Sequence, residues 1–119
     1  MAFQTEVEFT LPKGYLDGDG VLHREGVMRL ATAADEILPM KDPRVQQNPA
    51  YLTIVVLARV VTRLGSLADV NTKVVEGLFA SDLSYLEALY ESLNGEGGEA
   101  APAAPFERTA REFGVMGEA

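Results

Sequence analysis

The residues of this chain that stand out chemically are a short Asp-Gly repeat, one histidine and scattered serines. Asp17-Gly18-Asp19-Gly20 begins like a calcium loop, in which oxygen ligands recur at alternate positions. The pattern then fails, because Val21 stands at the fifth loop position and Met28 stands where a bidentate glutamate is needed. We therefore interpret the repeat as a hairpin turn, for which Asp-Gly pairs are strong signals.

Other catalytic and metal-binding patterns lack the partners that they need. His23 is the single histidine and the chain has no cysteine, so we expect His23 to be a solvated strand residue rather than a ligand. Carboxylate pairs such as Asp35-Glu36 are better explained by helix-start electrostatics than by acid–base catalysis. No phosphate-binding glycine loop follows a strand, and no nucleophile-elbow context surrounds the serines Ser66, Ser81, Ser84 and Ser92. The sequence predicts a protein that is not an enzyme and uses no cofactor.

The N-terminal third of the chain has the period of β structure. Apolar and polar residues alternate from Phe3 to Leu11, and a return strand is expected from His23 to Leu30. Thr32 with Asp35 three residues later resembles a capping box and predicts a short helix over residues 33–38. Because prolines favour extended backbone before them, we expect residues 40–47 to form a loop.

Helical periodicity replaces the period of two after this loop. The patterns predict helices over Pro49–Leu64, Thr72–Phe79 and Asp82–Leu93. The first is apolar on most sides and is expected to be buried, with Gly65 as a left-handed stop. We therefore predict an α+β fold, in which an N-terminal antiparallel β-hairpin packs on a small helical bundle.

The composition changes after Asn94, which divides the chain into a domain over residues 1–94 and a C-terminal segment over residues 95–119. This segment is rich in glycine, alanine, proline and glutamate and is expected to be flexible. Phe106, Ala110 and Phe113 would share one face of a short helix at 106–113. The segment is either a disordered tail or a motif that folds on a partner.

Length and charge set limits on the class of protein. With 119 residues the chain forms one modest core, and its net charge of −8 disfavours nucleic acid and anionic membranes. No apolar run is long enough to span a bilayer, and the acidic N-terminus is unlike a signal peptide. We expect a soluble cytoplasmic protein.

Three segments together resemble a known family, the phage tail assembly proteins or tail assembly chaperones of Mu-like phages and contractile injection clusters. These segments are the hairpin EVEFTLPKGYLDGDGVLHREGVMRLATAADEI, the helix AYLTIVVLARVVTRLG and the closing VNTKVVEGLFASDLSYLEALYESLN. The family's closing-helix positions correspond here to Leu78, Asp82, Leu83, Leu86 and Tyr90, with structural roles. The resemblance implies a non-enzymatic helper that binds tape-measure protein, tail-tube subunits or both before assembly.

The residues expected to contact a partner are Leu86, Tyr90, Phe106 and Phe113. For the leucine-rich stripe that contains Leu86 and Tyr90, core packing and a docking surface both remain open. Two other functions also remain open: a permanent structural component of the baseplate or tube, and an unrelated acidic protein-interaction domain. Presence in purified particles separates the first alternative from an assembly chaperone, and neighbouring genes separate the second.

Overall fold

The computed structural model describes residues 5–95, which form an antiparallel sheet covered by helices. β1 (Glu6–Leu16) and β2 (Leu22–Arg29) form the expected hairpin, and β3 (Val61–Leu64) pairs with β2 to give the order β1-β2-β3. In the turn, Asp17 Oδ1 accepts hydrogen bonds from the backbone N–H groups of Asp19 and Val21, at 2.8 and 2.9 Å. The α+β class and the Asp-Gly hairpin turn are therefore confirmed.

β1 contains a wide bulge near its centre. Thr10 pairs with Glu25, and Tyr15 pairs with His23. Five residue steps along β1 therefore lie opposite two residue steps along β2, so β1 contains three more residues here than the facing part of β2. Gly14 within the bulge has a φ of 106°, a conformation that a side chain disfavours. The bulge brings backbone N–H groups of β1 toward the helix that crosses this strand.

The segment after β2 is more helical than expected. α1 (Ala33–Ile37) is followed by the 3₁₀ helix η1 (Leu38–Lys41) and by α2 (Pro43–Gln47). The predicted loop over residues 40–47 was therefore wrong. Asp42 caps α2 by accepting a hydrogen bond from Arg44 N–H, and Pro43 occupies the first helical position, where its missing N–H is not needed.

The long predicted helix over Pro49–Leu64 is three elements. η2 (Pro49–Tyr51) leads into α3 (Leu52–Val60), and the chain then extends into β3. The prediction was wrong for residues 61–64, because these residues hydrogen-bond to the open side of β2. Gly65 has the expected positive φ, 55°, but it follows a strand, and its N–H donates to Glu25 O.

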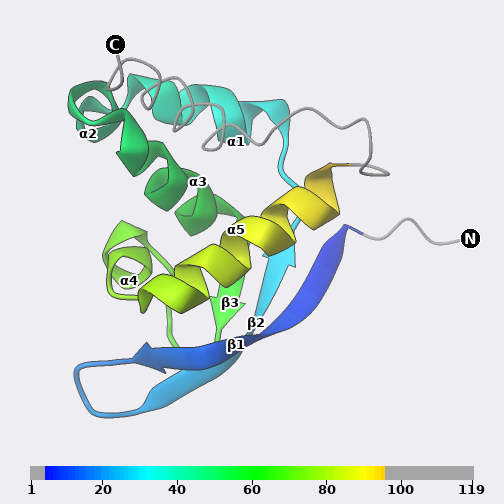
Figure 1. The fold of residues 1–119 in the computed structure, drawn as a ribbon, viewed down its shortest axis with the longest axis vertical. Helices are drawn as coiled ribbons and strands as arrows, with labels where there is room; N and C mark the ends of the chain where they lie inside the picture. Colours follow the sequence, from blue (N-terminus) through cyan, green and yellow to red (C-terminus); the bar gives the residue numbers. More distant parts are fainter. Residues whose placement is uncertain (1–4, 96–119) are drawn as a thin grey trace, which may run out of the picture.

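The last two helices complete the core. α4 (Thr72–Glu76) is capped by Asn71 and is shorter than the predicted Thr72–Phe79, while α5 (Ala80–Asn94) extends slightly beyond the predicted Asp82–Leu93. Figure 1 shows α5 crossing the sheet, where it packs on β1, with the Phe9 and Tyr85 rings edge to face. α3 contacts α1, α4 and α5. The fully buried core side chains include Leu11, Met28, Leu52, Val56, Leu57, Val60, Leu86 and Tyr90.

Candidate functional site

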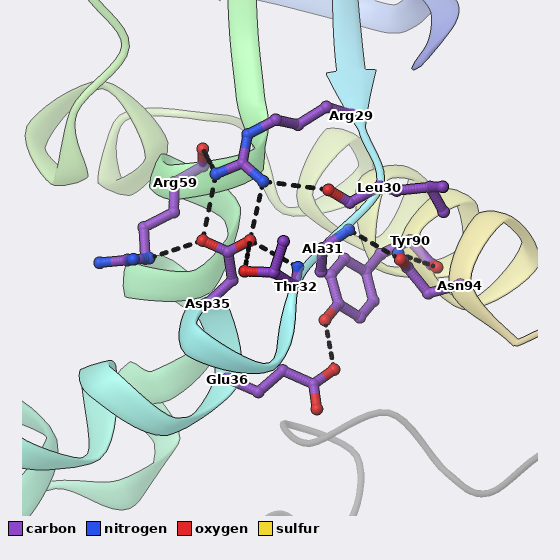
Figure 2. Close-up of polar contacts among 9 residues, drawn as sticks. All are labelled: Arg29, Leu30, Ala31, Thr32, Asp35, Glu36, Arg59, Tyr90 and Asn94. Carbon is purple, nitrogen blue, oxygen red and sulfur yellow. Dashed lines mark hydrogen bonds and ion pairs between the residues drawn. The ribbon is translucent and has the colours of Figure 1, made fainter. Parts of the chain in front are cut away.

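A buried carboxylate joins three elements at the start of α1 (Figure 2). Asp35 is 2% exposed and forms ion pairs with Arg29 of β2, at 2.7 Å, and with Arg59 of α3, at 2.9 Å. Its Oδ2 also accepts hydrogen bonds from the N–H and the hydroxyl of Thr32. The Arg29 guanidinium, helped by Thr32 and Arg59, holds the pKa of Asp35 well below its usual range, although burial acts in the opposite direction.

The same region ties α5 to α1. The Tyr90 hydroxyl donates to Glu36 Oε2 at 2.6 Å, and Asn94 Oδ1 accepts from Ala31 N–H at 2.9 Å. Burial, reinforced by the Glu36 carboxylate, raises the pKa of Tyr90. Because both oxygens of Asp35 accept hydrogen bonds that join secondary-structure elements, we assign this network a structural role.

A second buried carboxylate holds the bulge of β1. Asp82 is fully buried, and its two oxygens accept hydrogen bonds from Lys13 N–H, at 2.9 Å, and Gly14 N–H, at 2.7 Å. On the other side, the Arg24 guanidinium donates to the carbonyls of Leu11 and Pro12. Asp82, in the first turn of α5, therefore satisfies backbone groups of a strand 68 positions away in the sequence.

His23 is not solvated, so that prediction was wrong. Its side chain is 4% exposed because Gly65 and Ser66 pack over the ring. Nδ1 accepts a hydrogen bond from Ser66 N–H at 3.2 Å, which leaves Nε2 to donate to Asp17 Oδ2 at 2.8 Å. The ring therefore joins the hairpin turn to the end of β3, and its hydrogen bond is the main cause that lowers the pKa of Asp17.

An apolar surface lies where α1 passes into η1. Ile37, Leu38 and Met40, which we call the apolar patch, are 61%, 44% and 52% exposed, whereas Pro39 between them is buried. Met40 also borders a pocket of about 210 Å³, lined in addition by Val45, Gln46, Pro49 and Leu52. This volume is below the range of about 300–1,000 Å³ for small-molecule sites, so the pocket suits one large apolar side chain.

Two of the expected partner-binding residues lie in the core. Leu86 and Tyr90 are 2% and 1% exposed, and they pack between α5 and the elements beneath it. They are therefore covered in this fold, which favours the core-packing interpretation of their stripe. Phe106 and Phe113, with the segment over residues 96–119, lie outside the described residues.

The apolar patch was not recognised in the sequence. Ile37-Leu38-Pro39-Met40 is a run of four apolar residues, and a single helical turn can direct only part of such a run toward the core. The signal was therefore present. The predicted loop over residues 40–47 does not specify which of these side chains the fold buries.

Chemistry-bearing clusters are sparse in the described part of the chain. Between residues 5 and 95, no group of three or more histidine and carboxylate side chains is arranged to hold a metal ion. Across the same residues, no helix has both the length and the apolar character to cross a bilayer.

No protein-family model, curated protein or solved structure matches the chain.

Proposed function

We propose that this protein is a non-enzymatic assembly factor for a phage-like tail or contractile injection apparatus. In this role, the apolar patch and its pocket bind an apolar segment of the tape-measure protein, of tail-tube subunits, or of both. The observation that carries the proposal is the exposure of Ile37, Leu38 and Met40 beside a pocket of side-chain size. Exposed apolar surface of this kind marks interaction sites on soluble domains. The choice of partner comes from the resemblance of residues 3–94 to tail assembly chaperones.

The surroundings of the patch suit an interaction with a protein chain. Met40 is unbranched and polarizable, so it can adapt to apolar side chains of different shapes. The backbone around Met40 is held in place, because Asp35 pairs with Arg29 and Arg59 five residues earlier and Asp42 caps α2 two residues later. A fixed backbone with adaptable side chains allows binding with little loss of main-chain entropy.

The test compares two double variants of the full chain. Leu38→Ser/Met40→Ser removes apolar area from the patch, and Val21→Ser/Leu22→Ser removes a similar area from the hairpin, where both residues are also about half exposed. Each variant is co-expressed with a tape-measure protein and with a tail-tube subunit, and the co-purified partner is quantified. We expect at least about a tenfold loss of affinity for the patch variant only, as for the loss of one interface hot spot. Equal recovery by both variants and the wild type would refute the proposal.

A further inference from the structure

The pocket beside the apolar patch has the size and the lining of a site for one aromatic side chain. An engineered protein cavity of about 150 Å³ holds a benzene ring. The pocket here measures about 210 Å³, so it has room for the two fused rings of an indole. Met40 forms part of its wall, and methionine sulfur makes favourable contacts with aromatic rings.

Gln46 gives this pocket one polar contact. It is the polar residue of the lining, and its side-chain amide makes no hydrogen bond with another residue in the described part of the chain. The amide oxygen is an acceptor, and the indole N–H of tryptophan is a donor that usually finds an acceptor when the ring is buried. Phenylalanine and leucine have no such donor. Tryptophan therefore matches both the volume and the acceptor.

The charges around the pocket favour a carboxylate beside that tryptophan. Lys41 follows Met40, is exposed, and forms no ion pair within residues 5–95. Asp42 and Arg44, the other charged residues of the segment 37–52, pair with each other at 2.8 Å. Lys41 therefore leaves one uncompensated positive charge next to the pocket, which an acidic neighbour of the tryptophan complements.

We propose that the pocket binds a tryptophan side chain of the partner, with Gln46 accepting a hydrogen bond from the indole N–H and Lys41 facing an adjacent carboxylate. The inference rests on the proposed function, because it names the side chain by which the tape-measure or tube protein is held. A single aromatic residue that fills a pocket carries much of the binding energy of many interfaces. The flanking apolar patch then contacts the residues on either side of the tryptophan.

Titration of the full chain with blocked amino acids tests which side chain the pocket accepts. N-acetyl-tryptophanamide, N-acetyl-phenylalaninamide and N-acetyl-leucinamide are added separately, and backbone amide chemical shifts report affinity and location. We expect saturable binding of the tryptophan probe on the order of millimolar, with shifts at residues 40–52, and at least about tenfold weaker binding of the smaller leucine probe. Absence of saturable tryptophan binding, shifts elsewhere on the domain, or equal binding of leucine would overturn the inference.

Gln46→Leu removes the acceptor and nearly keeps the size of the side chain. It should weaken binding of the tryptophan probe about fivefold and leave the phenylalanine probe unchanged, as the loss of one hydrogen bond requires. Gln47→Leu, at an exposed position outside the pocket lining, is the control and should change neither. Unchanged tryptophan binding by Gln46→Leu would contradict the hydrogen bond and, with it, the choice of tryptophan.

The role of Lys41 is tested with two dipeptide probes at low salt, N-acetyl-aspartyl-tryptophanamide and N-acetyl-lysyl-tryptophanamide. The aspartyl probe should bind about threefold more tightly, because its carboxylate faces an exposed cation. Lys41→Gln should remove this difference, whereas Lys73→Gln, at an exposed position of α4, should retain it. Equal affinity of the two probes for the wild type would overturn the acidic neighbour.

These titrations distinguish the inference from the proposed function. If the tryptophan probe binds at the pocket while Leu38→Ser/Met40→Ser keeps its partner, the pocket accepts tryptophan and the proposed function is wrong. If that variant loses its partner while the tryptophan and leucine probes bind equally, the patch binds a partner and the inference is wrong.

Discussion

Two buried carboxylates, Asp35 and Asp82, each connect segments that are distant in the sequence. Asp35 binds guanidinium groups from β2 and α3, and Asp82 binds two backbone N–H groups of β1. Neither residue leaves an oxygen without a hydrogen-bond donor. At the scale of single residues, the buried polar side chains therefore hold the strands and helices in position.

Replacing Asp35 with asparagine should lower the free energy of unfolding by about 2–3 kcal/mol, because two charge-assisted contacts are lost at a buried position. The loss stays below that of a fully buried pair, since Arg29 and Arg59 are about a third exposed and water can solvate them. Asp42→Asn is the control: it keeps the cap of α2 and breaks a more exposed pair, so about 1 kcal/mol or less is expected. Urea unfolding measures both, and equal losses would contradict the assignment.

The lowered pKa of Asp35 predicts how stability depends on pH. Its carboxyl has a lower pKa in the folded protein than in the unfolded chain, where the value is near 3.8. Its contribution to stability is therefore complete above pH about 4 and is lost as the pH falls further toward the folded pKa. Melting temperatures between pH 6 and 2 should fall more steeply for the wild type than for Asp35→Asn. Parallel curves would show that Asp35 does not contribute in this way.

Part of this polar network could be predicted from the sequence. The spacing of Thr32 and Asp35 predicted their contact, because a capping box depends on neighbours within one turn. The contacts with Arg29 and Arg59 could not be predicted, since they depend on how a strand and a helix from other parts of the chain are packed. The burial of His23 was unpredictable for the same reason, because Ser66 and Gly65 reach it through the pairing of β3.

At the scale of elements, the bulge in β1 shows that the position of a helix and the pairing of the sheet depend on each other. Three extra residues in β1 leave backbone groups unpaired, and Asp82 of α5 and Arg24 of β2 satisfy them. The position of α5 on β1 is therefore fixed by hydrogen bonds as well as by apolar packing.

Asp82→Asn should destabilise the fold by about 1–3 kcal/mol, because the amide can accept at one oxygen only and one of the N–H groups of Lys13 and Gly14 is left unpaired. Asp19→Asn, in the exposed turn, removes the same charge without such a bond and should change stability by less than about 0.5 kcal/mol. Chemical denaturation of the two variants measures the difference. An Asp82→Asn protein as stable as Asp19→Asn would show that the bulge does not need its carboxylate.

At the change from α3 to β3, the local sequence pattern no longer determines the secondary structure. Val60, Val61 and Thr62 are β-branched and suit either a helix or a strand, and the length of the apolar run favoured a helix. The outcome depends on β2, whose free side needs a hydrogen-bonding partner. Such a tertiary requirement is absent from any local window of sequence.

At the scale of the whole molecule, the buried apolar residues of the described part of the chain form one core. The buried apolar residues come from the sheet, α2, α3, α4 and α5, and they meet around α3. The fold class and the burial of the helix that contains Leu57 were predicted correctly, because apolar periodicity depends mainly on local sequence. The apolar patch was not predicted, because exposure depends on which elements surround η1.

Leu57→Ala and Leu86→Ala should each cost about 2–5 kcal/mol, because both side chains are fully enclosed and their removal leaves cavities. Leu22→Ala, at a half-exposed position in the hairpin, should cost less than about 0.5 kcal/mol. Thermal melts compare the three variants. Losses of only a few degrees for both core variants would contradict this description of the core.

The central claim is that partners bind at the apolar patch, and amide hydrogen exchange of the full chain tests it most directly. Exchange is measured for the protein alone and in the presence of a tape-measure protein or a tail-tube subunit. Binding at the apolar patch predicts new protection over residues 37–52, which include the patch and the pocket, and none at the hairpin turn over residues 17–21. Protection that leaves residues 37–52 unchanged and appears elsewhere on the domain would contradict it.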